Sequence, residues 1–226
     1  MTESASKSRV ISTQQIVVTA MLCAISFVAV LIGRLIPNVA GFLSYDPKDA
    51  IIVIAGFIYG PLTSVVISVV VSLIEMFTIS TTGVYGLIMN VFSTCAFAVP
   101  AALIYKKMHS MKGAVIGLAV GAISMTVCML LWNYIITPFY MGVPRETVAG
   151  MLMTVFLPFN LVKGGLNAAI TLLLYKPIVN ALRKAHLAEP SKGNGQKGKI
   201  SPGFTLFALA ILITFVLLLL VMIGVL

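Results

Sequence analysis

Three polar side chains lie on one face of a predicted membrane helix. They are Asn160, Lys163 and Asn167, in the apolar stretch FLPFNLVKGGLNAAI at residues 156–170. Spacings of three and four residues bring them to the same side of an α-helix. If that helix begins near Met151 at the outer surface, Lys163 lies close to the centre of the bilayer. An unpaired lysine there costs about 2.5–3.5 kcal/mol on insertion scales, so its ammonium group should face a cavity or a partner inside the protein.

Two interpretations of this polar face remain open. Lys163 could form a structural salt bridge, with Glu75 as one candidate partner. Alternatively, Asn160, Lys163 and Asn167 belong to a substrate-binding site. We favour the site because further polar groups converge from another predicted helix.

The second set of candidates lies in LLWNYIITPFYMG, residues 130–142, with Trp132, Asn133 and Tyr134 side by side. A carboxamide presents both a donor and an acceptor, so Asn133 and Asn160 together with Lys163 could bind a ring that carries carbonyls and an imide N–H. Trp132 and Tyr134 could stack on such a ring or lie in an interfacial aromatic belt. This chemistry suits a planar heterocyclic vitamin better than an inorganic ion.

The composition places these side chains inside a membrane protein. Hydrophobic residues make up 60% of the 226 residues, charged residues make up 9%, and the mean hydropathy is +1.10. A soluble domain of this size cannot bury that much apolar surface. The formal charge of +9 comes mostly from short basic segments between apolar runs, which are typical of membrane orientation signals. We therefore expect a multi-pass protein of the cell membrane, surrounded by lipid, with no nucleic-acid partner.

Enzymatic chemistry has little support in the sequence. The motifs G-x-x-x-x-G-K-[ST], H-E-x-x-H and G-x-S-x-G do not occur. The cysteines, Cys23, Cys95 and Cys128, are isolated in apolar runs, which favours small core residues over a metal or redox site. We expect no catalytic residue, no metal site and no cofactor, and a chain that cannot hydrolyse ATP by itself.

Apolar runs predict six α-helices in residues 1–187, at about 14–34, 49–59, 61–77, 87–105, 113–136 and 151–175. Gly60 and Pro61 separate the short second helix from the third. Basic residues follow the fourth and sixth helices, so the positive-inside tendency predicts a cytoplasmic N-terminus and cytoplasmic ends for this domain. The loops predicted to lie outside mix both signs, and the first of them carries Arg34, Asp46, Lys48 and Asp49.

A further helix is predicted beyond this domain. Residues 188–203, AEPSKGNGQKGKISPG, have the composition of a flexible cytoplasmic linker. Residues 204–226 are uncharged and long enough to span a bilayer. We expect this segment to anchor the chain or to contact a partner. The predicted fold class is thus an all-α integral membrane protein, a six-helix bundle plus an additional C-terminal transmembrane helix.

Three stretches resemble the riboflavin-specific S-components of energy-coupling factor (ECF) vitamin transporters. They are YDPKDAIIVIAGFIYGP at 45–61, LWNYIITPFYMG at 131–142 and LPFNLVKGG at 157–165, and the similarity runs over about residues 10–185. The resemblance implies six helices that hold riboflavin near the extracellular side, capped by the loop after the first helix. It assigns flavin contacts to Asn133, Asn160 and Lys163. It also implies docking on a coupling membrane protein through Ala20 and Ala24.

The chain departs from the family pattern at two places. Glu75 stands where a basic residue is usual, and PKD at 47–49 replaces a more usual FSD. The C-terminal linker and helix lie outside the resemblance. Small residues also allow close helix packing within the chain, which is our interpretation of Gly113, Gly117 and Gly121 and an alternative for Ala20 and Ala24.

We conclude that the sequence predicts a riboflavin-binding S-component, with riboflavin as transported substrate rather than cofactor. A membrane coupling protein and two ATPase subunits would complete import. One alternative is an S-component for another vitamin, such as pantothenate or thiamine. The other is a stand-alone secondary carrier that uses Lys163 or Glu75 as an ion relay.

Overall fold

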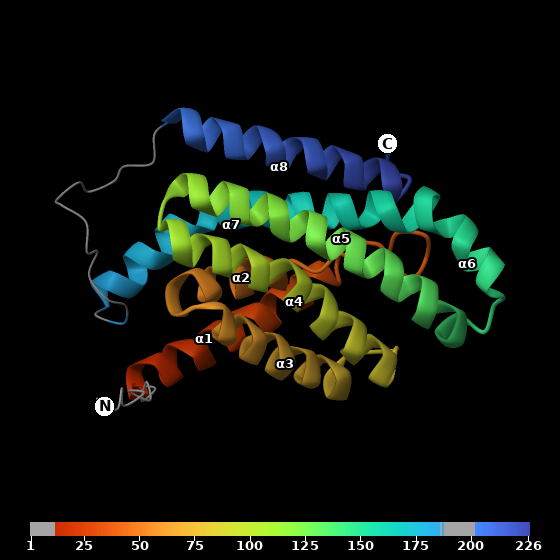
Figure 1. Ribbon diagram of the computed structural model, residues 1–226, viewed down its shortest axis with the longest axis horizontal. Coiled ribbons are helices and arrows are strands. Elements are labelled where there is room, and N and C mark those ends of the chain that lie inside the picture. The colour runs from red at the N-terminus through yellow and green to blue at the C-terminus, as the bar shows by residue number, and fades with distance from the viewer. Residues whose placement is uncertain (1–11, 186, 188–201) are drawn as a thin grey trace, which may run out of the picture.

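A computed structural model describes residues 12–185, 187 and 202–226. Within these residues the chain is helical, apart from turns and one isolated β-bridge between Val39 and Leu43. Figure 1 shows the long helices running side by side, with the start of α1 and the end of α7 at the same end of the molecule. The elements are α1 (Thr13–Gly33), α2 (Lys48–Tyr59), α3 (Pro61–Thr78), α4 (Gly83–Met108), α5 (Met111–Met141), α6 (Arg145–Met151), the π-helical turn η1 (Leu152–Phe156), α7 (Leu157–Lys184) and α8 (Pro202–Met222).

Local sequence explains where several of these helices begin and end. The Ser12 hydroxyl accepts a hydrogen bond from the Gln15 amide, and the Ser110 hydroxyl accepts one from the Gly113 amide, so α1 and α5 each have a side-chain N-cap. Gly60 separates α2 from α3 with a φ of 100°, a conformation that favours glycine. Pro61 then starts α3, where its missing N–H costs nothing. The predicted break at Gly60 and Pro61 is therefore confirmed.

The long helices extend beyond their predicted limits. The helix expected at 113–136 runs to Met141 in α5, and the one expected at 151–175 belongs to a continuous helical run from Arg145 to Lys184. Hydropathy reports the part of a helix that lipid surrounds, whereas a cap or a left-handed residue ends the helix itself. Gly142, with a φ of 65°, provides that end for α5.

Six helical segments of the described chain are long and apolar enough to cross a membrane. They are α1, α3, α4, α5, the α6–α7 run and α8. α2 is different, because its 12 residues measure only about 18 Å along the axis, less than the roughly 30 Å hydrocarbon core. Our expectation that the second helix returns across the membrane by itself therefore needs correction.

α2 is the central helix of the bundle. Ten consecutive residues, Lys48 to Phe57, are buried, and α2 contacts α1, α3, α4 and α7. Most residues of α2 are apolar, and they cover all sides of the helix, which is typical of a helix that other helices surround. Figure 1 shows α2 among the longer helices. Because α2 is short and central, the charged residues at its N-terminal end lie inside the protein.

Glycines bring α4 and α5 close together. A Cβ atom at Gly117 would lie 2.8 Å from the Ala101 carbonyl oxygen, and one at Gly121 would lie 2.4 Å from the Phe97 carbonyl oxygen. Both positions therefore serve packing within the chain, as predicted. Ala20 and Ala24 differ, because both are exposed on α1. Packing within the described chain does not explain these two alanines.

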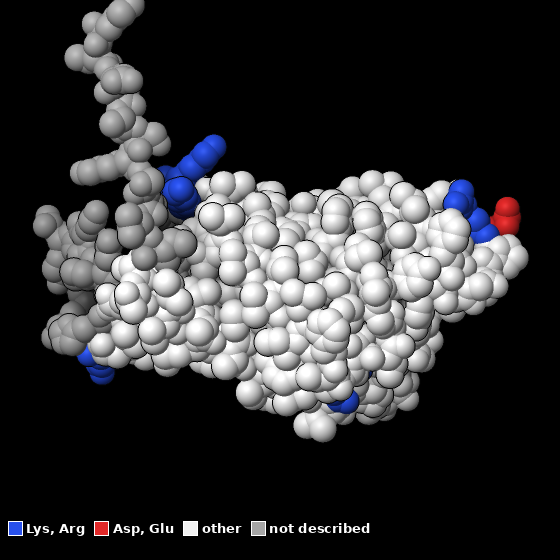
Figure 2. Space-filling model, turned by 90° about the horizontal axis from the view of Figure 1, so that it is seen from below, with Lys and Arg blue, Asp and Glu red and all other residues white. Residues whose placement is uncertain are grey.

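The predicted C-terminal helix forms as α8. It packs along α7, where the Phe215 ring occupies the space beside Gly165. Residues 188–201 of the predicted linker lie outside the described residues. Figure 2 shows that most of the visible charged side chains lie near the two ends of the long axis, with an almost uncharged surface between them. Such a band is expected where lipid surrounds a multi-pass protein.

Candidate substrate-binding site

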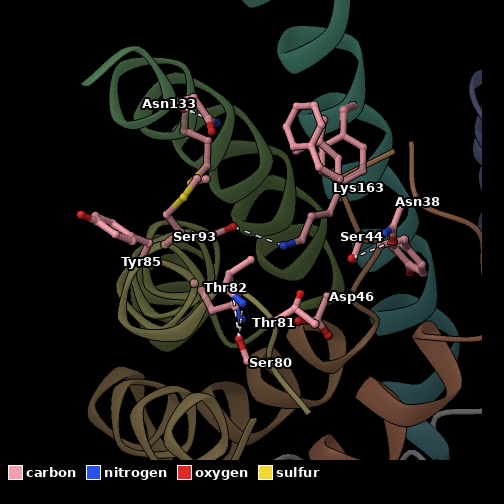
Figure 3. A pocket seen from close by; sticks show the side chains of 18 of the residues that line it. Asn38, Ser44, Asp46, Ser80, Thr81, Thr82, Tyr85, Ser93, Asn133 and Lys163 are labelled. Carbon is pink, nitrogen blue, oxygen red and sulfur yellow. Dashed lines mark hydrogen bonds between the residues drawn. The ribbon is translucent and has the colours of Figure 1, made fainter. Parts of the chain in front are cut away.

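A cavity of about 250 Å³ lies where α4, α5 and α7 meet the segment between α1 and α2. We call residues 34–47 the cap segment. Eight of its residues line the cavity: Arg34, Asn38 and residues 41–46. The turn at residues 80–82 closes another side. Figure 3 shows Asn38, Ser44 and Asp46 on one side of the cavity, and Asn133 and Tyr85 on others.

Three of the predicted site residues line this cavity together: Asn133 from α5, and Asn160 and Lys163 from α7. The Asn133 side chain donates to the Met129 carbonyl at 2.8 Å and accepts from the Thr137 hydroxyl at 2.9 Å. The Asn160 side chain donates to the Phe156 carbonyl at 2.8 Å. These bonds to their own helices fix the direction of both carboxamides.

Lys163 lies near the midpoint of the Arg145–Lys184 run, and 7% of its surface is exposed. Its ammonium group donates to the Ser93 hydroxyl at 3.3 Å and lies 3.4 Å from the Asp49 carboxylate. Figure 3 shows the Lys163 side chain reaching across the cavity toward Ser93 on α4. Lys163 thus lines the cavity and also has a carboxylate partner, which combines the two interpretations of the sequence.

The other three predicted site residues do not line the cavity. Trp132 stacks on Phe92 of α4, with ring centroids 4.4 Å apart. Tyr134 is 39% exposed, and the Arg145 guanidinium lies 5.4 Å from its ring centroid. Asn167 is fully buried and bonded to the cap segment and α2. The aromatic rings that do line the cavity are those of Phe42, Tyr45, Tyr85, Tyr140 and Phe159.

A cluster of buried ions adjoins the cavity, and two of its members, Asp46 and Glu75, line it. The Lys48 ammonium contacts the carboxylates of Asp46 and Glu75, and the Asn90 amide donates to Glu75 at 3.0 Å. The partner suggested for Lys163 was therefore wrong, since Glu75 pairs with Lys48. Glu75 and the PKD stretch at 47–49 are the two departures from the family pattern, and in the structure they contact each other.

Asp49 forms the second half of this ionic cluster. Its carboxylate accepts a hydrogen bond from the Thr94 hydroxyl at 2.6 Å and one from the Asn167 amide at 3.4 Å, besides facing Lys163. Lys48 and Asp49 are 0% exposed and Asp46 is 8% exposed. Lys48 and Asp49, which we expected in an outer loop, lie in α2 instead, whereas Asp46 lies in the cap segment as expected. The attraction between these paired charges offsets the desolvation cost of burying them.

Electrostatics keep the cap-segment carboxylate ionised. Burial opposes ionisation of Asp46, but the nearby ammonium groups of Lys48 and Lys163 outweigh it, so the pKa of Asp46 is lower than usual. Asp46 therefore remains a negative group at the edge of the cavity at neutral pH.

One sequence signal could have identified the cluster. Glu75 lies in an otherwise apolar run, and DPKD immediately precedes an apolar helix. An isolated charge in a membrane needs a partner, so an excess of unassigned buried charges points to pairing among them. Sequence alone gave no signal for Ser93, Met129 or Tyr85 as cavity residues.

The cavity presents donors and acceptors between aromatic and aliphatic walls. Asn133 and Asn160 offer amide groups, Lys163 offers an ammonium, and aromatic rings approach from the cap segment, α4, α5 and α7. Such a site suits a planar, mostly uncharged ligand with polar ring edges. In the described part of the chain, no group of three or more His, Cys, Asp and Glu side chains could hold a metal ion.

Comparison with known proteins agrees with this description. Residues 14–175 match the family described as the substrate-specific component of ECF transporters. The riboflavin transporter FmnP of Bacillus subtilis (strain 168) is 30% identical over 191 residues, which cover 77% of this chain and 98% of that protein. The riboflavin transporter RibU of Staphylococcus aureus (strain TCH60) is 28% identical over 177 residues, covering 76% and 93%.

A solved structure is also similar. It is described as the S component of a bacterial ECF transporter, and it matches with a TM-score of 0.65 and 28% identity, covering 75% of this chain and 98% of that chain. The family match ends at residue 175, so α8 lies outside it. The relatives are transporters rather than enzymes. This chain belongs to the family of substrate-specific components of ECF transporters and is a multi-pass membrane protein.

Proposed function

We propose that this chain binds riboflavin with high affinity and hands it to an ECF transporter for import. The observation that carries the proposal is the meeting of Asn133, Asn160 and Lys163 at one cavity with aromatic walls. The isoalloxazine ring of riboflavin is planar, and its edge carries two carbonyls and an imide N–H. Amide groups match this edge with both donors and acceptors, and the ammonium supplies a further donor. The names of the relatives support the same substrate.

The size of the cavity fits a closed or partly closed site. Its volume of about 250 Å³ lies just below the usual range for small-molecule pockets, roughly 300–1,000 Å³. A three-ring ligand with a sugar-alcohol chain therefore requires some outward movement of the walls. The cap segment and the short turn at residues 80–82 are the walls that no helix forms, and the cap segment is the longer of the two, so it is the part best able to move.

The substrate is tested with purified protein. The full chain in detergent, taken from cells grown in rich medium, should show flavin absorbance, and riboflavin added to ligand-free protein should lose fluorescence on binding. A nanomolar dissociation constant is the expected result. A folded preparation that ignores riboflavin but binds pantothenate or thiamine would overturn the proposal.

We further propose that a membrane coupling protein and two ATPase subunits complete transport. The chain has no phosphate-binding motif, and the exposed Ala20 and Ala24 offer a flat strip on α1 where another helix could approach closely. In vesicles the chain alone should bind riboflavin without accumulating it. Accumulation driven by a proton or sodium gradient, without added subunits, contradicts this proposal.

We also propose a cytoplasmic N-terminus. α1 begins at the end of the molecule where α4 ends and α5 begins. Lys106 and Lys107 lie in the last turn of α4 and Lys112 in the first turn of α5, and basic residues favour the cytoplasmic side. In right-side-out vesicles, an impermeant maleimide should label Thr147→Cys directly but Lys107→Cys only after permeabilisation. The opposite labelling pattern would reverse the orientation.

A further inference from the structure

Asn167 lies on the same face of α7 as Asn160 and Lys163 but has different surroundings. It is 0% exposed and lies outside the cavity lining. Its amide nitrogen donates to the Asp46 carbonyl oxygen at 3.1 Å and to the Asp49 carboxylate at 3.4 Å. Its amide oxygen accepts from the Tyr45 hydroxyl at 3.0 Å. Both amide protons and the oxygen are thus engaged, which leaves little capacity for a ligand.

Two of these three bonds go to the end of the cap segment. Tyr45 and Asp46 both line the cavity, and both are at most 8% exposed. One side chain of α7 therefore holds a side chain and a main-chain carbonyl of the cap segment at once. The bonds are buried, so water does not compete for them, and losing one leaves an unsatisfied polar group.

Contacts of other kinds hold the remainder of the cap segment. The turn at its tip is closed by main-chain bonds between Val39 and Leu43, and the Asn38–Ser44 side-chain bond is exposed. Phe42 meets Phe156 edge-on at 5.9 Å. The tip is held by local bonds, ring packing and the apolar contacts of Val39, which is 3% exposed, whereas the Tyr45–Asp46 end has buried polar bonds to α7.

From this arrangement we infer that Asn167 is a positioning residue, which latches the cap segment over the cavity through Tyr45 and Asp46 rather than contacting substrate. The inference rests on the proposed riboflavin site for its kinetic consequence. If the cap segment must move for substrate to enter and leave, the latch sets how often it opens. Weakening the latch raises the dissociation rate of riboflavin while Asn133, Asn160 and Lys163 remain in place.

The test compares three variants of the full chain in detergent. Asn167→Ala removes both cap bonds and the bond to Asp49, and Tyr45→Phe removes only the Tyr45 hydroxyl. Thr171→Val is the matched control, because Thr171 lies one turn further along α7 and bonds to the Asn167 and Ala50 carbonyls at 2.7 and 3.5 Å, with no bond to the cap segment. All three lose buried hydrogen bonds, so general loss of stability is shared among them.

The first measurement is hydrogen exchange in ligand-free protein. Amides of residues 36–46 should exchange about tenfold faster in Asn167→Ala and about 2- to 10-fold faster in Tyr45→Phe. Exchange in α4 and α5 should not change. Thr171→Val should leave the cap segment at the wild-type rate. Unchanged cap exchange in Asn167→Ala overturns the latch, whatever the chain binds.

The second measurement is stopped-flow dissociation of riboflavin. Asn167→Ala and Tyr45→Phe should release riboflavin faster by similar factors. The double variant should be no faster than Asn167→Ala, because Asn167→Ala has already lost the bond that Tyr45→Phe removes. If riboflavin dissociates at the wild-type rate although cap exchange has risen, the latch does not control release and that part of the inference is wrong. If the wild type fails to bind riboflavin while cap exchange responds as expected, the proposed substrate fails and the latch stands.

Discussion

Lys163 shows how one side chain can meet two demands in a membrane. It lines the cavity, and its ammonium lies 3.4 Å from the carboxylate of Asp49, which is fully buried. The carboxylate offsets much of the cost of placing a cation near the bilayer centre. Removing Lys163 should therefore affect both ligand binding and folding, through separable causes.

Lys163→Met tests this separation. We expect riboflavin binding to weaken by roughly 5- to 150-fold, because a ligand acceptor loses its partner. The melting temperature of the ligand-free protein should also fall, because the buried Asp49 carboxylate loses its cation partner. Adding Asp49→Asn should restore the melting temperature but not the affinity. Unchanged affinity in Lys163→Met would leave only the structural role.

Asn160 offers a purer test of substrate recognition. Asn160→Ala removes an amide that lines the cavity and bonds only to its own helix among the described residues. Riboflavin binding, followed by fluorescence quenching, should weaken by roughly 5- to 150-fold. Thr154→Ala is the control, because Thr154 is exposed and likewise bonds to its own helix, at the Gly150 carbonyl. Equal affinities of the two variants would remove Asn160 from the site.

At the scale of elements, close packing between α4 and α5 fixes the site. Asn133 on α5 and Ser93 on α4 both line the cavity, and the glycine contacts set the distance between their helices. α2 also contributes, because its buried N-terminal end carries Asp49, which pairs with Lys163, and Lys48, which pairs with Glu75. The shape of the cavity therefore depends on the spacing between these helices.

Gly121→Ala should disturb this spacing. The new Cβ would lie 2.4 Å from the Phe97 carbonyl oxygen, and since that atom is backbone, a helix must move. We expect a loss of about 1–3 kcal/mol, seen as a lower melting temperature in detergent. Gly150→Ala, where nothing lies within 4 Å of the new Cβ, should not lower it. Equal melting temperatures for the two variants would contradict the packing role.

The exposed strip on α1 should matter only for transport. Replacing Ala20 and Ala24 with Leu adds bulk on the outer face of α1, where a coupling protein would need close approach. Riboflavin binding by the purified variant should equal that of the wild type. Uptake by cells that supply the coupling and ATPase subunits should fall severalfold or more. Normal uptake would place the docking surface elsewhere.

At the scale of the whole molecule, the family core and α8 are distinct parts. No residue that lines the cavity comes from α8, although α8 packs along α7. α8 is uncharged, and only 11% of its most apolar 18-residue stretch is buried. The chain thus adds a spanning helix beside a core that already contains the whole cavity.

Truncation after residue 187 tests the independence of the core. The shortened protein should remain folded and bind riboflavin within about tenfold of the full chain, because α8 mainly exchanges contacts with α7 for contacts with lipid. Size-exclusion profiles and fluorescence titration measure both properties. Loss of binding in a monodisperse preparation would show that α8 supports the site.

The sequence by itself determined the membrane class, the break at Gly60–Pro61 and the extra C-terminal helix. These features follow from hydropathy, helix length and the backbone limits of glycine and proline, which are local properties of the chain. Periodicity likewise placed Asn160, Lys163 and Asn167 on one face of a helix. It could not say that the first two reach a cavity while the third bonds to the cap segment.

Only the tertiary structure decided how the polar residues pair. Lys48 with Glu75, Lys163 with Asp49, and Asn167 with Tyr45 each join residues at least 27 positions apart in the sequence. Trp132 and Tyr134 flank Asn133 along the chain, yet neighbouring residues on a helix point in different directions, and neither ring lines the cavity. Which charges are buried, and beside which partner, depends on the distances between helices, and hydrophobic patterns carry no information about those distances.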